Sequence, residues 1–161
     1  RVDRFVGTHF FFPVPLNPLL ELIPTDATAP DVLQIFTDLG GRLGKHTIVV
    51  KKDVPGFIMN RIFGAMTCEA VRLVEQGVGT VTDIDHGLTT GFGMLQGPLA
   101  KADMAGLDVC LLAFQNIHDM DGSIDPPDLL RRLVAEGKFG RKTGEGFYRY
   151  DAHGRLIGPA F

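Results

Sequence analysis

A histidine and a glutamate near the start of the chain have residue types and a spacing suited to acid–base chemistry. His9 stands in a largely apolar stretch, and Glu21 follows twelve positions later inside the apolar run Leu19–Ile23. A carboxylate buried in such a run is strongly destabilising unless it is paired, so Glu21 needs a partner, and His9 is the nearest candidate. A carboxylate on one imidazole nitrogen fixes the tautomer and leaves the other nitrogen free to take a proton.

A second polar candidate, Asn60, follows the turn-forming pair Pro55-Gly56. This pair predicts a chain reversal immediately before a helix, which would direct Asn60 back toward the strand that carries His9. A polar residue in a first helical turn is also common for structural reasons alone. Its neighbour Arg61 is interpreted as structural.

The elements that must position these residues begin with a short mixed segment. Residues 4–12 and 19–24 are predicted strands, separated by the proline-rich stretch 13–18. Pro30 and Asp31 are expected to open a helix that ends at about Leu43, and residues 46–50 are a third predicted strand. A β-β-α-β segment of this length buries too little surface to be an independent domain. It is interpreted as the tail of a larger α/β sheet.

From Pro55 onward the pattern is helical, and no further strands are expected. Helices are predicted over about 56–76, from a cap at Thr80 or Thr82, over about 98–120, and from Pro126-Pro127 to Gly137. The predicted fold class is therefore mixed: an α/β remnant over residues 1–52, followed by an all-α domain over residues 53–161.

Three segments together resemble the 3-hydroxyacyl-CoA dehydrogenase family over residues 1 to about 150. They are His9-Phe10-Phe11-Phe12-Pro13, the stretch Asp53–Arg61, and the stretch Lys138–Tyr150. The resemblance implies the end of an NAD-binding domain followed by the helical C-terminal domain. The chain contains no G-x-G-x-x-G, so the residues that bind NAD are expected upstream of Arg1.

The resemblance also implies roles for the candidate residues. His9 would take the proton of the substrate 3-hydroxyl while hydride leaves for NAD, Glu21 would orient His9, and Asn60 would contact the substrate near the reacting oxygen. Phe12 departs from the family, which usually has asparagine there to bond the thioester end of the substrate. The acyl preference is expected to differ for that reason.

Two further segments match the family in part and are interpreted mainly as structural. Gly97-Pro98, Asp103 and Gly106–Asp108 suit a helix start with a capping carboxylate; in the family this region packs the helical domain and walls the acyl pocket. The glycines of Lys142–Tyr148 allow a tight turn that lays Phe147 and Tyr148 over the helices.

The leading functional hypothesis is an NAD-dependent oxidation of (3S)-3-hydroxyacyl-CoA to 3-oxoacyl-CoA, with the isolated chain inactive. The alternatives are a related dehydrogenase of another 3-hydroxy acid and an inactive dimerisation and acyl-binding module. Phe63, Met66 and Leu73 extend the apolar surface of the first long helix beyond one narrow face, which indicates a homodimer through the helical domain.

Composition argues against several other classes of protein. The formal net charge of −3 and the scattered basic residues do not suit nucleic-acid binding, and no apolar run is long enough for a membrane span. Cys68 and Cys110 form no local Cys-x-x-Cys motif and are expected as buried thiols, while the histidines lack metal-ligand spacing. A metal-free protein of the cytoplasm or the mitochondrial matrix is expected.

Overall fold

The computed structural model describes residues 1–161 and divides into two compact units. Unit 1 is Arg1–Ile58 and unit 2 is Met59–Phe161. Each unit has a hydrophobic core of its own. The first combines a short sheet with a helix, and the second is mostly helical, in agreement with the predicted mixed fold class.

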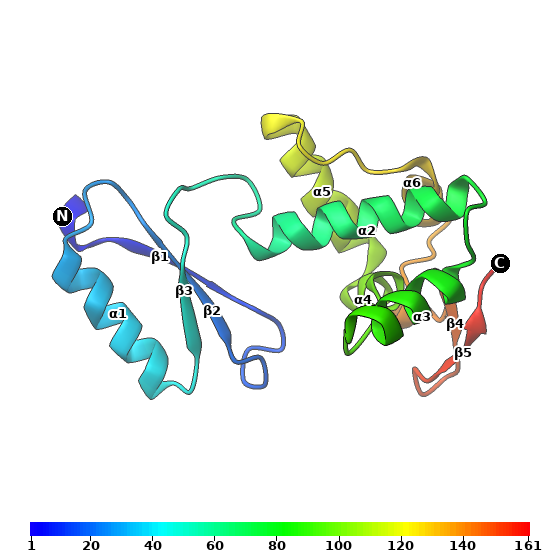
Figure 1. The fold of residues 1–161 in the computed structure, drawn as a ribbon, viewed down its shortest axis with the longest axis horizontal. Coiled ribbons are helices and arrows are strands. Elements are labelled where there is room, and N and C mark those ends of the chain that lie inside the picture. The colour runs from blue at the N-terminus through cyan, green and yellow to red at the C-terminus, as the bar shows by residue number, and fades with distance from the viewer. The chain divides into compact units, whose positions relative to one another are not determined.

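Unit 1 has the β-β-α-β order that the sequence predicts. Its elements are η1 (Val2–Arg4), β1 (Val6–Phe10), β2 (Leu19–Pro24), α1 (Pro30–Arg42) and β3 (His46–Val49). The strands form one sheet in the order β1-β2-β3, in which β1 is antiparallel to β2 and β2 is parallel to β3. The crossover from β2 to the parallel strand β3 is made by α1, which lies along the sheet (Figure 1).

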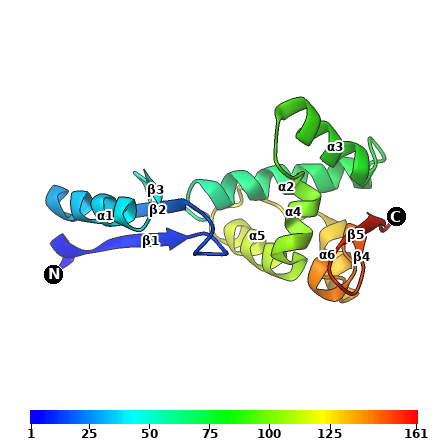
Figure 2. The same ribbon diagram turned by 90° about the horizontal axis from the view of Figure 1, so that it is seen from below.

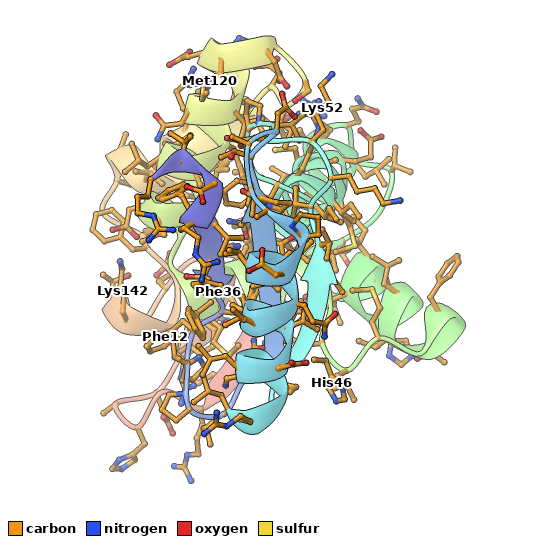
Figure 3. The ribbon with its side chains drawn as sticks, turned by 90° about the vertical axis from the view of Figure 1, so that its left-hand side faces the viewer. Phe12, Phe36, His46, Lys52, Met120 and Lys142 are labelled. Carbon is orange, nitrogen blue, oxygen red and sulfur yellow. The ribbon has the colours of Figure 1, made fainter.

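The core of unit 1 lies between α1 and one face of this sheet (Figure 2). Val6, Leu20 and Leu22 are buried there, and Leu33 and Phe36 of α1 pack against them. Figure 3 marks Phe36 on α1. Because side chains alternate along a strand, the residues between these core positions face the other side of the sheet. That alternation places His9 and Glu21 on the face opposite α1.

Unit 2 contains five helices, a short 3-10 turn and a terminal hairpin. They are α2 (Met59–Glu75), α3 (Val81–Phe92), α4 (Pro98–Ala105), α5 (Leu107–Asp121), α6 (Asp128–Ala135), η2 (Arg141–Thr143), β4 (Tyr148–Tyr150) and β5 (Leu156–Pro159). Within this unit, α3 and α5 lie on different sides of the long helix α2 (Figure 1 and Figure 2). Gly64 allows α2 to approach α5 closely, since a Cβ there would stand 2.7 Å from Ile124 and 3.0 Å from Phe114.

The prediction of one helix over 98–120 is wrong, because the helix is interrupted at Gly106. That residue has φ +100°, which a helix does not allow, and α4 ends before it while α5 begins after it. The break turns the Leu107 N–H out of α4, and it donates to the Phe139 carbonyl 3.0 Å away. The helical spacing of apolar residues continues across Gly106, so the sequence pattern does not reveal that α5 takes a different direction from α4.

The expectation of no strands after Pro55 is also wrong. β4 and β5 pair antiparallel near the C-terminus. Phe147, directly before β4, and Tyr148, its first residue, are both buried in the helical core, as predicted. The strands are only three and four residues long, so they carry little periodic signal.

Of the two predicted caps of α3, Thr80 and Thr82, the N-cap is Thr80. Its hydroxyl accepts from the Asp83 N–H, and the Asp83 carboxylate in turn accepts from the Thr80 N–H, which forms a capping box. The sequence pattern Thr82-x-x-Asp85 also resembles a capping box, but Asp85 is not part of one. It is buried and accepts hydrogen bonds from the Leu99 and Ala100 N–H groups at 2.9 and 2.8 Å, which caps the start of α4 from another helix.

Candidate acid–base site

The predicted contact between His9 and Glu21 is present. The two residues stand opposite each other in the β1–β2 register, and His9 Nδ1 lies 2.7 Å from Glu21 Oε2. The Glu21 side chain is 0% exposed and the His9 side chain is 26% exposed. An ionised carboxylate can only accept, so Nδ1 carries the proton of this bond and, in the neutral ring, Nε2 has the free lone pair.

The surroundings of this pair come from two further segments of unit 1. The Phe11 ring lies 4.5 Å from the His9 ring between centroids, and the Phe57 ring lies 5.4 Å from it. The Ile58 N–H donates to Glu21 Oε1 at 3.1 Å. Both carboxylate oxygens thus accept a hydrogen bond, which meets the requirement that a buried carboxylate be paired.

Phe57 and Ile58 are site residues that the sequence analysis did not single out. The motif Pro55-Gly56-Phe57 indicated only a turn, and the side of the turn that faces the strands is not encoded in any local pattern. The one available signal was an aromatic residue directly after a glycine in a turn, where a small or polar residue is more usual.

The other predicted site residues have the following places. Asn60 is the second residue of α2 and belongs to unit 2, so its approach to His9 remains a prediction. Arg61 also belongs to unit 2 and pairs with Asp121 at the end of α5, at 2.6 Å, in keeping with a structural role. Hydrogen bonds from Ser123 and from Arg61 lower the pKa of Asp121 to about 2. Phe12 is 89% exposed in the loop after β1 (Figure 3).

Asp103 has a structural role, although it does not cap a helix start. It is buried on α4 and accepts from the Phe147 N–H at 3.0 Å, from the Tyr148 N–H at 2.9 Å and from the Tyr150 hydroxyl at 3.0 Å. Burial raises the pKa of Asp103 to about 6 against the effect of these hydrogen bonds. The carboxylate therefore fastens the C-terminal segment to the helices.

The two cysteines are free and buried in unit 2, as predicted. Desolvation raises the pKa of Cys68 to about 11 and that of Cys110 to about 12. Both thiols are therefore protonated at neutral pH, and they act as small apolar groups of the core rather than as nucleophiles.

A hollow of about 570 Å³ opens in unit 1 beside the candidate pair. Its lining includes Gly7, Ile23, Lys51, Lys52 and Phe57, but His9 is not part of it. Gly7 and Ile23 face each other in the β1–β2 register two positions from His9 and Glu21 and therefore lie on the same sheet face. Phe57 thus contacts the candidate pair and also borders the hollow.

The residues present do not form a dinucleotide-binding turn. Such a turn needs a glycine-rich loop between a strand and a helix N-terminus, whereas α1 follows Asp26–Ala29 and has Pro30 at its first turn. No group of three or more His, Cys, Asp or Glu side chains could hold a metal ion. No helix has the length and apolar character needed to cross a membrane.

Two family descriptions match almost the whole chain. Residues 1–54 match the 3-hydroxyacyl-CoA dehydrogenase NAD-binding domain, and residues 56–150 match the 3-hydroxyacyl-CoA dehydrogenase C-terminal domain. The chain is 44% identical over 153 residues to the mitochondrial hydroxyacyl-coenzyme A dehydrogenase of Sus scrofa; this covers 93% of the chain and 48% of the pig protein. The chain thus spans about half the length of the curated relatives it matches.

Solved structures agree with this assignment. The (S)-3-hydroxybutyryl-CoA dehydrogenase of Ralstonia eutropha superposes with a TM-score of 0.86 at 41% identity, covering 92% of this chain and 53% of that one. An NAD⁺-dependent dismutase, the 5-dehydrogenase of a formyl-hydroxy-methylpyridine carboxylic acid, superposes with a TM-score of 0.69 at 38% identity, covering 94% and 50%. The chain belongs to the 3-hydroxyacyl-CoA dehydrogenase family, with part of the NAD-binding domain followed by the C-terminal domain.

Proposed function

We propose that the complete protein containing this chain oxidises (3S)-3-hydroxyacyl-CoA to 3-oxoacyl-CoA with NAD, reversibly. The observation that carries the proposal is the 2.7 Å contact between the part-exposed His9 and the fully buried Glu21. A histidine held in one tautomer by a buried carboxylate is suited to exchange a proton with a substrate hydroxyl.

In this proposal the chain supplies the proton transfer. His9 Nε2 accepts the proton of the 3-hydroxyl, and the Glu21 carboxylate stabilises the imidazolium that results, as in other carboxylate–histidine pairs. In the reverse direction the imidazolium returns the proton to the developing alkoxide. NAD, bound mostly by residues outside this chain, would accept the hydride.

Asn60 and the helical unit complete the proposal. The Asn60 amide would donate to the reacting oxygen of the substrate, where charge develops during hydride transfer. Its support is the match of Asp53–Arg61 to the family motif. We further propose an acyl-CoA substrate and a homodimer that forms through unit 2. The proposed location is the cytoplasm or the mitochondrial matrix, because the relatives include a mitochondrial enzyme.

A second candidate is a dehydrogenase of a different hydroxy acid. Phe12 stands where the family usually has asparagine, and it offers the substrate packing instead of an amide hydrogen bond. A relative at 38% identity that acts on a substituted pyridine carboxylic acid supports substrate variation within this fold.

Substrate turnover separates the two candidates. NADH formation by the complete protein is measured with (3S)-3-hydroxybutyryl-CoA, with longer 3-hydroxyacyl-CoA thioesters, and with free 3-hydroxybutyrate. The first proposal predicts turnover of the thioesters only. Turnover of the free acid, with none of the thioesters, would favour the second candidate.

A further inference from the structure

The turn that follows β3 holds one residue in an unusual backbone conformation. Phe57 has φ +49°, and it is the only residue other than glycine with a positive φ. Gly56 directly before it has φ +78°, so two consecutive residues are left-handed. A bulky aromatic residue is rare in this conformation, which glycine adopts without strain. Strain of this kind persists only where the surrounding structure enforces it, and it is frequent at functional sites.

The side chain of Phe57 contacts His9 rather than a core. Its ring lies 5.4 Å from the His9 ring at an interplanar angle of 53°, and Phe57 belongs to neither hydrophobic core. The residue is only half-buried and borders the hollow beside the sheet. General core packing therefore does not explain why phenylalanine occupies a position where glycine would be unstrained.

The next residue contacts the partner of His9. The Ile58 N–H donates to Glu21 Oε1 at 3.1 Å, while the Phe57 N–H closes the turn on the Val54 carbonyl at 2.9 Å. The backbone angles of Phe57 set the direction of the Ile58 N–H relative to the Phe57 ring. The left-handed conformation thus directs consecutive residues to the two members of one pair, the ring to His9 and the N–H to Glu21.

We infer that Phe57 is a positioning residue that holds the His9–Glu21 pair in its reactive arrangement. Its ring restricts rotation of the His9 imidazole, and its backbone conformation directs the Ile58 N–H to Oε1 of Glu21. Proton transfer depends on the direction of His9 Nε2. A substitution of Phe57 that lets the His9 imidazole rotate therefore lowers the rate of the chemical step more than it weakens substrate binding. The inference rests on the proposed function, in which His9 exchanges the proton.

Two substitutions separate the ring from the backbone conformation. Phe57→Gly removes the ring and keeps a residue suited to positive φ, while Phe57→Leu keeps apolar bulk without the ring. Phe57→Tyr retains the ring and serves as the conservative variant. Phe161→Leu makes the same change as Phe57→Leu at an exposed residue at the end of the chain and serves as the matched control.

The first measurement is steady-state kinetics of the complete protein. Phe57→Gly and Phe57→Leu are each expected to lower kcat about 10-fold with KM changed less than about 2-fold, as for misplacement of a catalytic group. Phe57→Tyr and Phe161→Leu should stay within about 2-fold of the unsubstituted protein. A kcat unchanged in both Phe57→Gly and Phe57→Leu, in a protein where His9→Gln is inactive, would overturn the inference and leave the proposed function standing. An active His9→Gln would refute the proposed function itself.

The second measurement needs no activity and uses the 161-residue chain with ¹⁵N-labelled histidine. Ring nitrogen chemical shifts report which nitrogen carries the proton. The unsubstituted chain should show His9 fixed as the Nδ1–H tautomer, with widely separated nitrogen shifts. In Phe57→Leu the two shifts should approach each other as the ring exchanges between arrangements. If Phe57→Gly and Phe57→Leu both keep the separation of nitrogen shifts seen in the unsubstituted chain, Phe57 does not position the His9–Glu21 pair.

Discussion

At the scale of single residues, the candidate acid–base site is built around one buried carboxylate. Glu21 has no exposed surface, yet each of its oxygens accepts a hydrogen bond, one from His9 and one from the Ile58 N–H. An unpaired carboxylate in that place would destabilise the fold. The contacts that satisfy the buried Glu21 carboxylate are therefore the same contacts that orient His9, which couples the stability of unit 1 to the geometry of the candidate site.

Phe12 gives a prediction on substrate preference. Phe12→Asn in the complete protein should raise kcat/KM for short 3-oxoacyl-CoA substrates about 2- to 10-fold, the value of one added hydrogen bond. Because Phe12 is 89% exposed, the free energy of unfolding should change by less than about 0.5 kcal/mol.

Leu16→Asn is the matched control, since Leu16 is 82% exposed in the same loop. It should leave both kcat/KM and stability unchanged. An equal change in kcat/KM for the two variants would show that the effect comes from the loop and not from an amide at position 12.

At the scale of elements, the C-terminal segment depends on one buried carboxyl. Burial raises the pKa of Asp103 from 3.8 to about 6, so between these values the folded chain holds a proton that the unfolded chain has lost. The contribution of Asp103 to the free energy of unfolding must then fall as the pH rises from about 4 to about 6, by up to about 3 kcal/mol, and stay constant above.

Urea unfolding of the chain and of Asp103→Asn between pH 4 and pH 7 tests this dependence. The free energy of unfolding of the unsubstituted chain should exceed that of Asp103→Asn by more at pH 4 than at pH 7. Asp119→Asn, at an exposed position of α5, should show no such trend. A stability difference that grows with pH would mean that the hydrogen bonds to Asp103 outweigh its desolvation.

The elements of unit 1 were predictable from sequence because each has a strong local signal. Alternating or continuous apolar runs marked β1, β2 and β3, and Pro30 marked the start of α1. The pairing of His9 with Glu21 could also be predicted, since a carboxylate in a buried run requires a partner. The contacts of Phe57 and Ile58 could not, because they depend on backbone angles that the sequence pattern does not specify.

The misses in unit 2 have a common physical cause. The break at Gly106, the capping of α4 by Asp85 and the attachment of β4 to Asp103 all depend on residues distant in sequence. Local periodicity reports how a helix faces its core, but it does not report which other segment satisfies a helix end or a buried carboxyl.

At the scale of the whole molecule, the first prediction concerns the cofactor. The 161-residue chain should not bind NAD at micromolar concentration and should have no appreciable dehydrogenase activity, because it has no glycine-rich turn to bind the pyrophosphate of the dinucleotide. Titration calorimetry of the chain with NAD is the measurement. Saturable binding in the micromolar range would contradict the prediction.

The second prediction at this scale is dimerisation through unit 2. Phe63, one residue of the predicted apolar surface, instead packs against the core, but Ile62 of α2 and Val109 and Leu112 of α5 are exposed. Apolar side chains of this kind are typical of dimer interfaces. Association should survive raised salt, which screens ion pairs but not apolar contacts.

Sedimentation of the chain at micromolar concentration in low and high salt tests this prediction. A dimer is expected in both conditions, and Leu112→Lys should weaken it. A monomer in low salt would contradict the prediction, and dissociation by salt alone would indicate an interface built on charges.

The central claim, that His9 exchanges the substrate proton, is tested most directly by the turnover of His9→Gln in the complete protein. The change should lower kcat about 10²- to 10⁴-fold with KM changed much less, as expected for the loss of a general acid–base group. Glu21→Gln should lower kcat by a smaller factor than His9→Gln. His46→Gln, at the exposed start of β3 (Figure 3), should retain full turnover. Near-normal turnover in His9→Gln, with the variant folded, would contradict the account and require another residue as the base.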